Sequence, residues 1–259
     1  MSSCFPITAP APRISIPPAG SSTQSSHCNL SLCKVFPLPV KDGQKTLSFD
    51  GNRKISFFRG INRLFTRVYH HVEVRSPPQI PPSGGAILVS NHISGLDPLV
   101  IQSALNRPVV WMMAKEYYEI ASLRWLFELI QAIPVQRSGR DMVAMRSAMR
   151  TLENGNILGV FPEGRIAATR ELLPFQTGVA LMAAKTATPI YCCALDGNSR
   201  GLEMRQAFSR RCEIKLAFGG RSEFDRCSTS REHLEAATAS IKADVDALRR
   251  GRLDKINRL

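Results

Sequence analysis

Short apolar runs alternate with helix-like segments between residues 84 and 220. The pattern predicts strands at residues 86–90, 109–114, 132–136, 156–161, 189–195 and 212–218. It predicts intervening helices at residues 98–105, 118–131, 141–154 and 175–187. Strands and helices that alternate in this way form a parallel sheet covered by helices. We therefore expect an α/β fold with a mainly parallel central sheet flanked by helices, followed by a last amphipathic helix at residues 230–250.

The chain is expected to be one folded domain preceded by a low-complexity extension. Residues 1–48 are rich in proline, serine and threonine, and their single arginine is Arg13. This composition predicts a disordered N-terminal extension rather than a transit peptide, which is normally richer in arginine. Residues 49–259 are predicted to form the folded domain, with its α/β core at residues 84–220.

The folded domain opens with a cationic segment at residues 53–70. Apolar residues recur there at helical spacing, and basic residues fill the gaps at Arg53, Lys54, Arg59, Arg63 and Arg67. The pattern predicts a cationic amphipathic helix with aromatic residues on its apolar face. That face can pack on the domain while the arginines are solvated, or it can contact lipid, and one helix can do both. His70 and His71 at its end are expected at the surface.

The chain is strongly basic, with a formal net charge of +13. Such a surplus suits an anionic partner, which can be nucleic acid, an anionic membrane surface or a phosphorylated substrate. No apolar run reaches the roughly 18 residues that a membrane-spanning helix needs. The seven cysteines form no CxxC pair, which argues against both a disulfide framework and a zinc site. We expect them to be reduced packing residues.

A polar turn follows the first predicted strand and contains His92 and Asp97. On a continuous helix, five residues would place these two side chains roughly 140° apart. In a turn that contains Gly95, the side chains can meet. A histidine and a carboxylate where a strand leads into a helix are well placed for chemistry in an α/β fold. The alternative is structural, because Asp97 before Pro98 also suits a helix N-cap.

Two further loops place charged side chains just after predicted strands. Arg137 and Arg140 follow the third predicted strand, whereas Glu163 and Arg165 follow the fourth. The carboxyl ends of parallel strands share one edge of the sheet, so we expect both loops to approach His92. The alternatives are a solvated arginine loop and a Glu163 side chain held in an ion pair.

The three loops together would supply a base, a carboxylate and cations. Histidine is the natural base at neutral pH, and a carboxylate on its far ring nitrogen fixes the tautomer. Arginine binds phosphate through two parallel charge-assisted hydrogen bonds, which lysine cannot form. This combination of side chains suits the transfer of an acyl group to a hydroxyl of a phosphorylated molecule.

The order of these blocks resembles the glycerolipid acyltransferase family, which includes the 1-acylglycerol-3-phosphate acyltransferases and their relatives. The family's four blocks are matched in order by Asn91-His92 with Asp97, by residues 133–141, by residues 161–165 and, loosely, by residues 188–191. The second block is an apolar run that ends in an arginine-bearing loop, and the third is Phe-Pro-Glu-Gly followed by Thr or Arg. The resemblance covers roughly residues 60–220.

The resemblance implies a direct acyl transfer. His92 would be the general base for a glycerol hydroxyl, and Asp97 would orient it. The hydroxyl would attack the thioester of an acyl-CoA or an acyl carrier protein, which are donor substrates. No acyl-enzyme, metal or resident cofactor is expected.

The resemblance also implies how the acceptor is held. Arg137 and Arg165 would bind its phosphate, with Arg140 as a further candidate. Glu163 and Gly164 would shape the phosphate pocket.

Two features depart from the family. Many members carry Phe-Lys-x-Gly after the third block, whereas this chain has Phe-Gln-Thr-Gly at residues 175–178. A cation near the acceptor is therefore missing, and the choice of acceptor stays open. Many relatives have a spanning helix near the N-terminus, where this chain has the amphipathic segment at residues 53–70. Residues 196–211 match nothing in the family pattern.

We expect a peripheral-membrane acyltransferase, on the cytoplasmic side and without a transmembrane helix. It would make phosphatidic acid from lysophosphatidic acid, with the lysophospholipid, the acyl donor and an anionic membrane surface as partners. One alternative is the same transfer to a different lysophospholipid or an amino-acid lysolipid. The other is a non-catalytic protein that binds an anionic membrane or nucleic acid. Nucleic acid is not the expected partner, because the arginines are dispersed and no nucleic-acid motif is recognisable.

Overall fold

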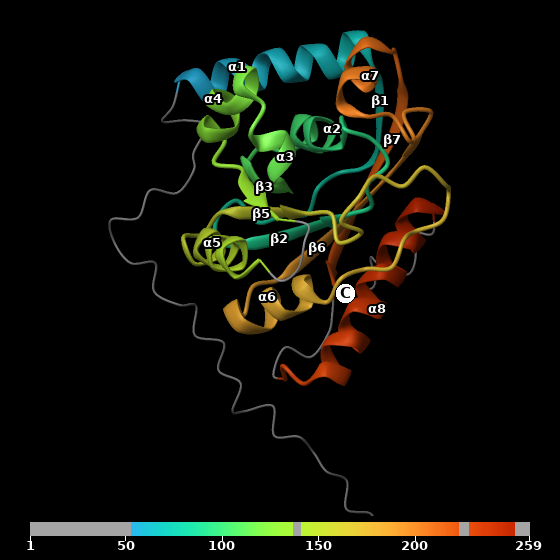
Figure 1. Ribbon diagram of the computed structural model, residues 1–259. Helices are drawn as coiled ribbons and strands as arrows, with labels where there is room; N and C mark the ends of the chain where they lie inside the picture. Colours follow the sequence, from blue (N-terminus) through green and yellow to red (C-terminus); the bar gives the residue numbers. More distant parts are fainter. Residues whose placement is uncertain (1–52, 137–140, 223–227, 252–259) are drawn as a thin grey trace, which may run out of the picture. The chain divides into compact units, whose positions relative to one another are not determined.

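The computed structural model describes residues 53–136, 141–222 and 228–251. The extension predicted at residues 1–48 lies outside the described residues, as does the loop with Arg137 and Arg140. The predicted α/β class is confirmed, because helices flank a mostly parallel seven-stranded sheet (Figure 1).

All six predicted strands are present in the sheet, together with one that was not predicted. Their bounds are His71–Ser76 (β1), Ala86–Ser90 (β2), Val109–Ala114 (β3), Ile133–Val135 (β4), Ile157–Val160 (β5), Ile190–Gly197 (β6) and Glu213–Ser222 (β7). The spatial order is β1-β7-β6-β2-β5-β3-β4. Neighbouring strands run parallel except for β6 and β7, which are antiparallel. The carboxyl ends of β2, β5 and β6 therefore lie at one edge of the sheet.

Helices cover both faces of the sheet. Their bounds are Arg53–Leu64 (α1), Asp97–Ala104 (α2), Lys115–Tyr118 (α3), Ala121–Leu129 (α4), Met142–Glu153 (α5), Gly178–Thr186 (α6), Met204–Ser209 (α7) and Arg231–Arg249 (α8). A π-helical turn, Phe65–Tyr69 (η1), extends α1. Helices α5, α6 and α8 lie on one face, and α1 to α4 and α7 lie on the other (Figure 1). None of the helices in the described ranges combines the length and the hydrophobicity that crossing a bilayer requires.

The central strands bury side chains on both faces, which is why they appear in the sequence as unbroken apolar runs. In β2, Ala86 and Leu88 pack in the core beneath α2, whereas Ile87 and Val89 pack against the layer of α5, α6 and α8. Successive side chains of a strand point to opposite faces, so both layers hold β2 in place. The residues that follow β2 therefore begin from a strand that is packed on both faces.

Three local features differ from the prediction. The single helix expected at residues 118–131 is two helices, because Ile120 takes an extended backbone conformation between α3 and α4. Strand β1 was not predicted, because it is a half-exposed edge strand whose partner, β7, lies far away in the sequence. Helix α7 falls in the segment at residues 196–211 that matched no pattern, and its six residues are too few to show a period.

The cysteines among the described residues are packing residues, as predicted. Cys192, Cys193 and Cys212 are buried free thiols. Burial raises the pKa of the Cys193 thiol to about 12, so this side chain stays protonated at neutral pH.

His70 is buried, which corrects the prediction that it lies at the surface, whereas its neighbour His71 is exposed. The imidazole packs edge-on against the rings of Phe65 and Tyr69, with both centroid distances at 4.8 Å. Its Nδ1 accepts a hydrogen bond from the backbone N–H of Cys212 at 3.2 Å. The ring is therefore held neutral, and burial lowers its pKa below the ordinary value of 6.5.

We expect this burial to make the fold sensitive to mild acid. Because the pKa of His70 is lowered on folding, the unfolded chain takes up a proton first as the pH falls below 6.5, and unfolding becomes easier. Thermal unfolding measured from pH 7.5 to 5 should show a falling Tm. His70→Gln can still accept the Cys212 N–H but does not titrate, so its Tm should depend less on pH. His71→Gln is the matched control at the exposed neighbour, and equal pH slopes for all three proteins would contradict the prediction.

Candidate active site

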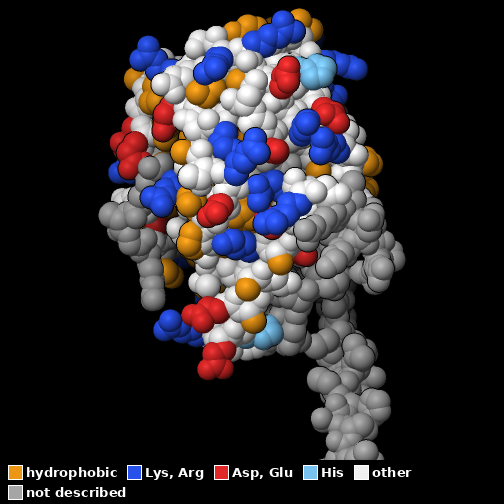
Figure 2. All heavy atoms as spheres, turned by 90° about the vertical axis from the view of Figure 1, so that its right-hand side faces the viewer, with side chains coloured by type: hydrophobic (Ala, Val, Ile, Leu, Met, Phe, Trp, Pro, Cys, Tyr) orange, Lys and Arg blue, Asp and Glu red, His pale blue; other side chains and the backbone are white. Residues whose placement is uncertain are grey.

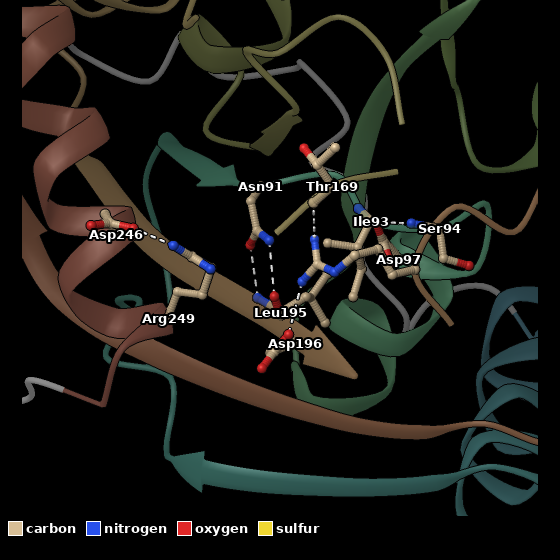
Figure 3. Close-up of polar contacts among 10 residues, drawn as sticks. Asn91, Ile93, Ser94, Asp97, Thr169, Leu195, Asp196, Asp246 and Arg249 are labelled. Atoms are coloured by element: carbon tan, nitrogen blue, oxygen red, sulfur yellow. Dashed lines mark hydrogen bonds and ion pairs between the residues drawn. The ribbon is translucent and has the colours of Figure 1, made fainter. Parts of the chain in front are cut away.

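Asn91 fastens the loop after β2 to the neighbouring strand. Its buried side-chain amide forms two hydrogen bonds with Leu195 of β6 (Figure 3). Nδ2 donates to the Leu195 carbonyl at 2.9 Å, and Oδ1 accepts the Leu195 N–H at 2.8 Å. Two bonds to one backbone residue fix the direction in which the chain leaves β2. His92, the next residue, therefore begins from a fixed backbone position.

The structure brings His92 and Asp97 together in the turn before α2. Nδ1 of His92 lies 2.8 Å from Oδ2 of Asp97. The same oxygen accepts the backbone N–H of Ile93 at 2.6 Å and of Ser94 at 2.9 Å, and the Asp97 side chain is fully buried. An oxygen that already accepts from two backbone groups also accepts the Nδ1 proton of the histidine. Nε2 of His92 is left with its lone pair and is the atom that can take a proton.

Asp97 does not cap α2, so the capping alternative is wrong. The N-cap residue is Leu96, and no side-chain hydrogen bond reaches the first amides of the helix. Asp97 is instead the first helical residue, and its carboxylate turns back toward the loop that precedes it. The interaction that remains for this buried carboxylate, beyond the loop backbone, is with His92.

The imidazole of His92 lies at the end of an aromatic stack. Its ring centroid is 4.1 Å from that of Phe161, with the planes 15° apart. Phe161 stacks in turn on Trp111 at 5.0 Å and 9°. Gly159 lies beneath the indole, where an added Cβ would come within 2.4 Å of the Trp111 ring. The stack restricts rotation of the His92 ring, whose side chain remains 18% exposed.

Glu163 joins its own loop, which also carries Arg165, to the turn that carries His92. One carboxylate oxygen accepts the backbone N–H of His92 at 2.9 Å, and the other accepts that of Leu173 at 3.0 Å. The residue is only 6% exposed, and burial raises its pKa, although the two backbone hydrogen bonds act in the opposite direction. Glu163 therefore supports the backbone of the histidine from within rather than facing an incoming ligand.

Of the other predicted site residues, the structure describes Gly164 and Arg165. Gly164 has a left-handed backbone, with φ of 69°, and the side-chain nitrogen of Gln176 lies 2.8 Å from the position of an added Cβ. Arg165 follows and is exposed. Arg137 and Arg140 lie outside the described residues, so their approach to His92 stays a prediction.

A segment that sequence reasoning missed, Gly201 and Leu202, holds the turn that carries His92. The Gly201 N–H donates to the Ile93 carbonyl at 2.8 Å, and the Gly95 N–H donates to the Leu202 carbonyl at 3.0 Å. On the other side, the Ala167 N–H donates to the His92 carbonyl at 2.7 Å. These bonds use backbone groups, which any residue type supplies, so no side-chain pattern at residues 196–211 could have indicated them.

The arrangement can perform general base chemistry on a hydroxyl. An oriented imidazole with a free nitrogen stands at the sheet edge, a buried carboxylate stabilises the imidazolium that forms, and an exposed arginine lies on the adjacent loop. Among the described residues, no group of three or more His, Cys, Asp or Glu side chains is placed to hold a metal ion.

Comparisons with known proteins agree on one family. The family model described as Acyltransferase matches residues 71–196, which include His92, Asp97, Glu163 and Arg165. The 1-acyl-sn-glycerol-3-phosphate acyltransferase of Bacillus subtilis is 24% identical over 191 residues, which is 71% of this chain and 91% of that protein. The human 1-acyl-sn-glycerol-3-phosphate acyltransferase alpha is 32% identical over 123 residues, which is 46% of this chain and 43% of that protein.

The fold is also similar to a solved structure. The crystal structure of the 1-acyl-sn-glycerophosphate (LPA) acyltransferase PlsC from Thermotoga maritima matches with a TM-score of 0.59 and 22% sequence identity. The match covers 77% of this chain and 82% of the other.

We predict that Asp97→Asn preserves the conformation of the turn but weakens the preference of His92 for the tautomer with its proton on Nδ1. The amide oxygen can still accept the N–H groups of Ile93 and Ser94, whereas the charge that favours a proton on Nδ1 is lost. Nitrogen-15 NMR at neutral pH should show one His92 tautomer, with the proton on Nδ1, in the wild type and a mixture in the variant.

Asp141→Asn is the matched control for this change. The Asp141 carboxylate also accepts three backbone N–H groups, those of Gln136, Val143 and Ala144, but it caps α5. Asparagine caps a helix as well as aspartate does. This control should leave the His92 tautomer unchanged, and a single unchanged tautomer in Asp97→Asn would contradict the prediction.

Proposed function

Since the chain belongs to the glycerolipid acyltransferase family, we propose that it transfers a fatty acyl group to the free hydroxyl of lysophosphatidic acid, forming phosphatidic acid. The donor is an acyl-CoA or an acyl carrier protein. The observation that carries the proposal is the His92–Asp97 pair, held at the sheet edge beside the loop that bears Arg165.

The proposed step is a direct transfer. Nε2 of His92 takes the proton of the acceptor hydroxyl as the oxygen attacks the carbonyl carbon of the thioester. A C–O bond forms, the C–S bond breaks, and the imidazolium returns the proton to the departing thiolate. Asp97 stabilises the imidazolium between these two transfers. The step balances without an acyl-enzyme, a metal or a resident cofactor.

Arg165 is the described residue best suited to the phosphate of the acceptor. It is exposed and follows directly after Gly164, on a loop whose start is bonded to the backbone of His92. A guanidinium can bind a phosphate through two parallel hydrogen bonds. We propose that Arg137 and Arg140 complete this phosphate site, and that Glu163 shapes it through the backbone bonds that it accepts.

One observation favours a second acceptor class. The side chain of Gln176 lies against Gly164, so a neutral amide stands beside the proposed phosphate site. An acceptor with fewer negative charges, such as a lysophospholipid with a phosphodiester or an amino-acid lysolipid, would need less neutralisation there. Acyl transfer to such a lysolipid is therefore the second candidate function.

Purified protein assayed against a panel of lysolipids should acylate lysophosphatidic acid fastest. The panel should include lysophospholipids with phosphodiester headgroups and an amino-acid lysolipid, each with acyl-CoA and with acyl carrier protein donors. His92→Ala should lose at least about 100-fold in rate, because a general base contributes roughly that much or more. Activity on another lysolipid without activity on lysophosphatidic acid would support the second candidate and contradict the first.

We also propose that the protein works at a membrane surface, and that α1 and η1 contact the lipid. Four apolar side chains at helical spacing point away from the domain, with exposed fractions of 65% for Phe57, 48% for Ile61, 65% for Leu64 and 64% for Val68. An exposed apolar stripe of this kind is typical of a helix that lies in a membrane interface.

The side of α1 that faces the domain carries the buried Ile55 together with polar side chains that bond to α2. Asn62 donates to the Leu99 carbonyl at 3.0 Å, and Arg63 donates to the Ser103 carbonyl at 3.1 Å. The Ser103 carbonyl lies in the last turn of α2, where carbonyl groups lack partners within the helix, and the two bonds together fix the rotation of α1 about its axis. The apolar stripe therefore lies on the side of α1 that faces away from α2. Helix α2 begins at Asp97, so α1 packs on the helix that follows the catalytic turn.

A second surface adds electrostatic attraction to anions. Lysine and arginine side chains gather on the face made by β1, β7, α7 and α8 (Figure 2). The exposed basic residues of these elements and of the turns next to them include Arg75, Arg205, Arg210, Arg211, Lys215, Arg221 and Arg250. Fewer acidic residues lie among them, so this face should prefer anionic lipid and lose its attraction as salt rises.

Binding to vesicles that contain anionic lipid should depend on the apolar stripe. The double variant Phe57→Ser/Leu64→Ser should bind such vesicles at least about tenfold more weakly, because each side chain loses a burial of about 1.5–3 kcal/mol. Vesicle co-sedimentation measures this, and binding of the wild type should weaken as salt rises.

The matched control is Met142→Ser/Val143→Ser. It removes two apolar side chains with exposed fractions of 55% and 69% from α5, on the opposite face of the sheet. This control should bind vesicles as the wild type does. Equal loss in both double variants, or tighter binding to a nucleic acid duplex than to vesicles, would contradict the membrane proposal.

A further inference from the structure

The loop that carries Arg165 is long and only sparsely held. It runs from Phe161, after β5, to the start of α6 at Gly178 and contains no helix or strand. Its base is fixed by Glu163 and by the bond from Ala167 to His92, and its end is fixed where the Gln176 N–H donates to the Pro162 carbonyl at 3.0 Å. Between these points, residues 168–171 are exposed.

Arg200 connects this exposed stretch to the sheet. Its guanidinium donates to the Thr169 carbonyl at 2.9 Å and to Oδ1 of Asp196, at the end of β6, at 2.8 Å. The Arg200 side chain is only 12% exposed, although it carries a full charge. A charge is buried at low cost only when it is paired and hydrogen-bonded, so the two contacts are expected to persist together.

The backbone next to Arg200 is attached to the catalytic turn. Gly201 and Leu202 bond to Ile93 and Gly95, and Leu202 forms an isolated parallel bridge with Ser94. Gly201 has a φ of 77°, and an added Cβ would lie 3.6 Å from the Cα of Ala168. Residues 200–202 therefore lie between the His92 turn and the Arg165 loop and contact both.

We propose that Arg200 is a positioning residue for the acceptor phosphate. By bonding to Thr169 and Asp196 at once, it holds the Arg165 loop at a fixed distance from His92. It touches neither reacting atom, so it acts on the affinity for the acceptor through Arg165 and not on the proton transfer. This role rests on the proposed acylation of a phosphorylated lysolipid.

The kinetic test is a double-mutant cycle between Arg165→Ala and Arg200→Ala. Each single variant should raise the KM for the acceptor, by roughly tenfold or more for Arg165→Ala if a charge-assisted bond is lost. The kcat and the KM for the acyl donor should stay within about twofold. Because Arg200 acts through Arg165, adding Arg200→Ala to Arg165→Ala should raise the acceptor KM no further.

Conservative and control variants sharpen the cycle. Arg200→Lys keeps the charge but lacks the planar fork that reaches both partners, so its KM should lie between those of wild type and Arg200→Ala. Arg249→Ala removes a similarly buried arginine, 14% exposed and paired with Asp246, that does not bond to the loop. It should leave the acceptor KM unchanged. If Arg200→Ala does not fold, Asp196→Asn takes its place in the same cycle.

Hydrogen–deuterium exchange provides a readout that does not depend on the reaction. Peptides covering residues 164–173 should exchange faster in Arg200→Ala than in the wild type, and at the wild-type rate in Arg249→Ala. Unchanged exchange in Arg200→Ala would overturn the proposal whatever the substrate. Faster exchange with no activity on any phosphorylated lysolipid would contradict the proposed function alone. If exchange is faster but the two substitutions raise the acceptor KM independently, so that their fold-changes multiply in the double variant, the proposal that Arg200 acts through Arg165 would be overturned.

Discussion

The carboxylate of Asp97 is the interaction on which the site depends. One of its oxygens accepts from Ile93, Ser94 and Nδ1 of His92, in a position with no access to solvent. A buried carboxylate is costly unless hydrogen bonds compensate it, and the turn between β2 and α2 directs these three donors at Oδ2 of Asp97. The same turn brings the histidine to the carboxylate. The stability of the turn and the orientation of the base therefore come from one set of bonds.

Two carboxylates support His92 in different ways. Asp97 meets the ring, whereas Glu163 meets the backbone N–H of the same residue. Burial raises the pKa of Glu163, and its two oxygens accept from different loops. Protonation would turn one of these acceptors into a donor and release one loop. Glu163 therefore serves the site as a link between the two loops through the backbone hydrogen bonds that it accepts, although it resembles a ligand-binding residue in the sequence.

Much of the fold and part of the site could be predicted from the sequence. The strands that are buried on both faces produce apolar runs that only a central sheet explains, and the glycerolipid acyltransferase family is confirmed by the comparisons. The meeting of His92 and Asp97 followed from local spacing in a turn. The burial of His70 and the contacts of Arg200 did not, because both depend on residues far away in the chain. Long-range backbone contacts leave no local signature.

The orientation of α1 shows a more general limit of sequence periodicity. A helical period reveals that a helix has two different faces, but it does not say which face meets the domain. Here the side chains of Asn62 and Arg63 bond to carbonyl groups of α2 and of Leu105, and Ile55 on the same side of α1 is buried. Burying the apolar stripe instead would leave those carbonyls without these partners and would bring Phe57 and Leu64 against polar groups. The outward direction of the apolar stripe thus follows from the bonds of Asn62 and Arg63 and from the burial of Ile55 on the opposite side of α1, and the lipid contact proposed for the stripe depends on that orientation.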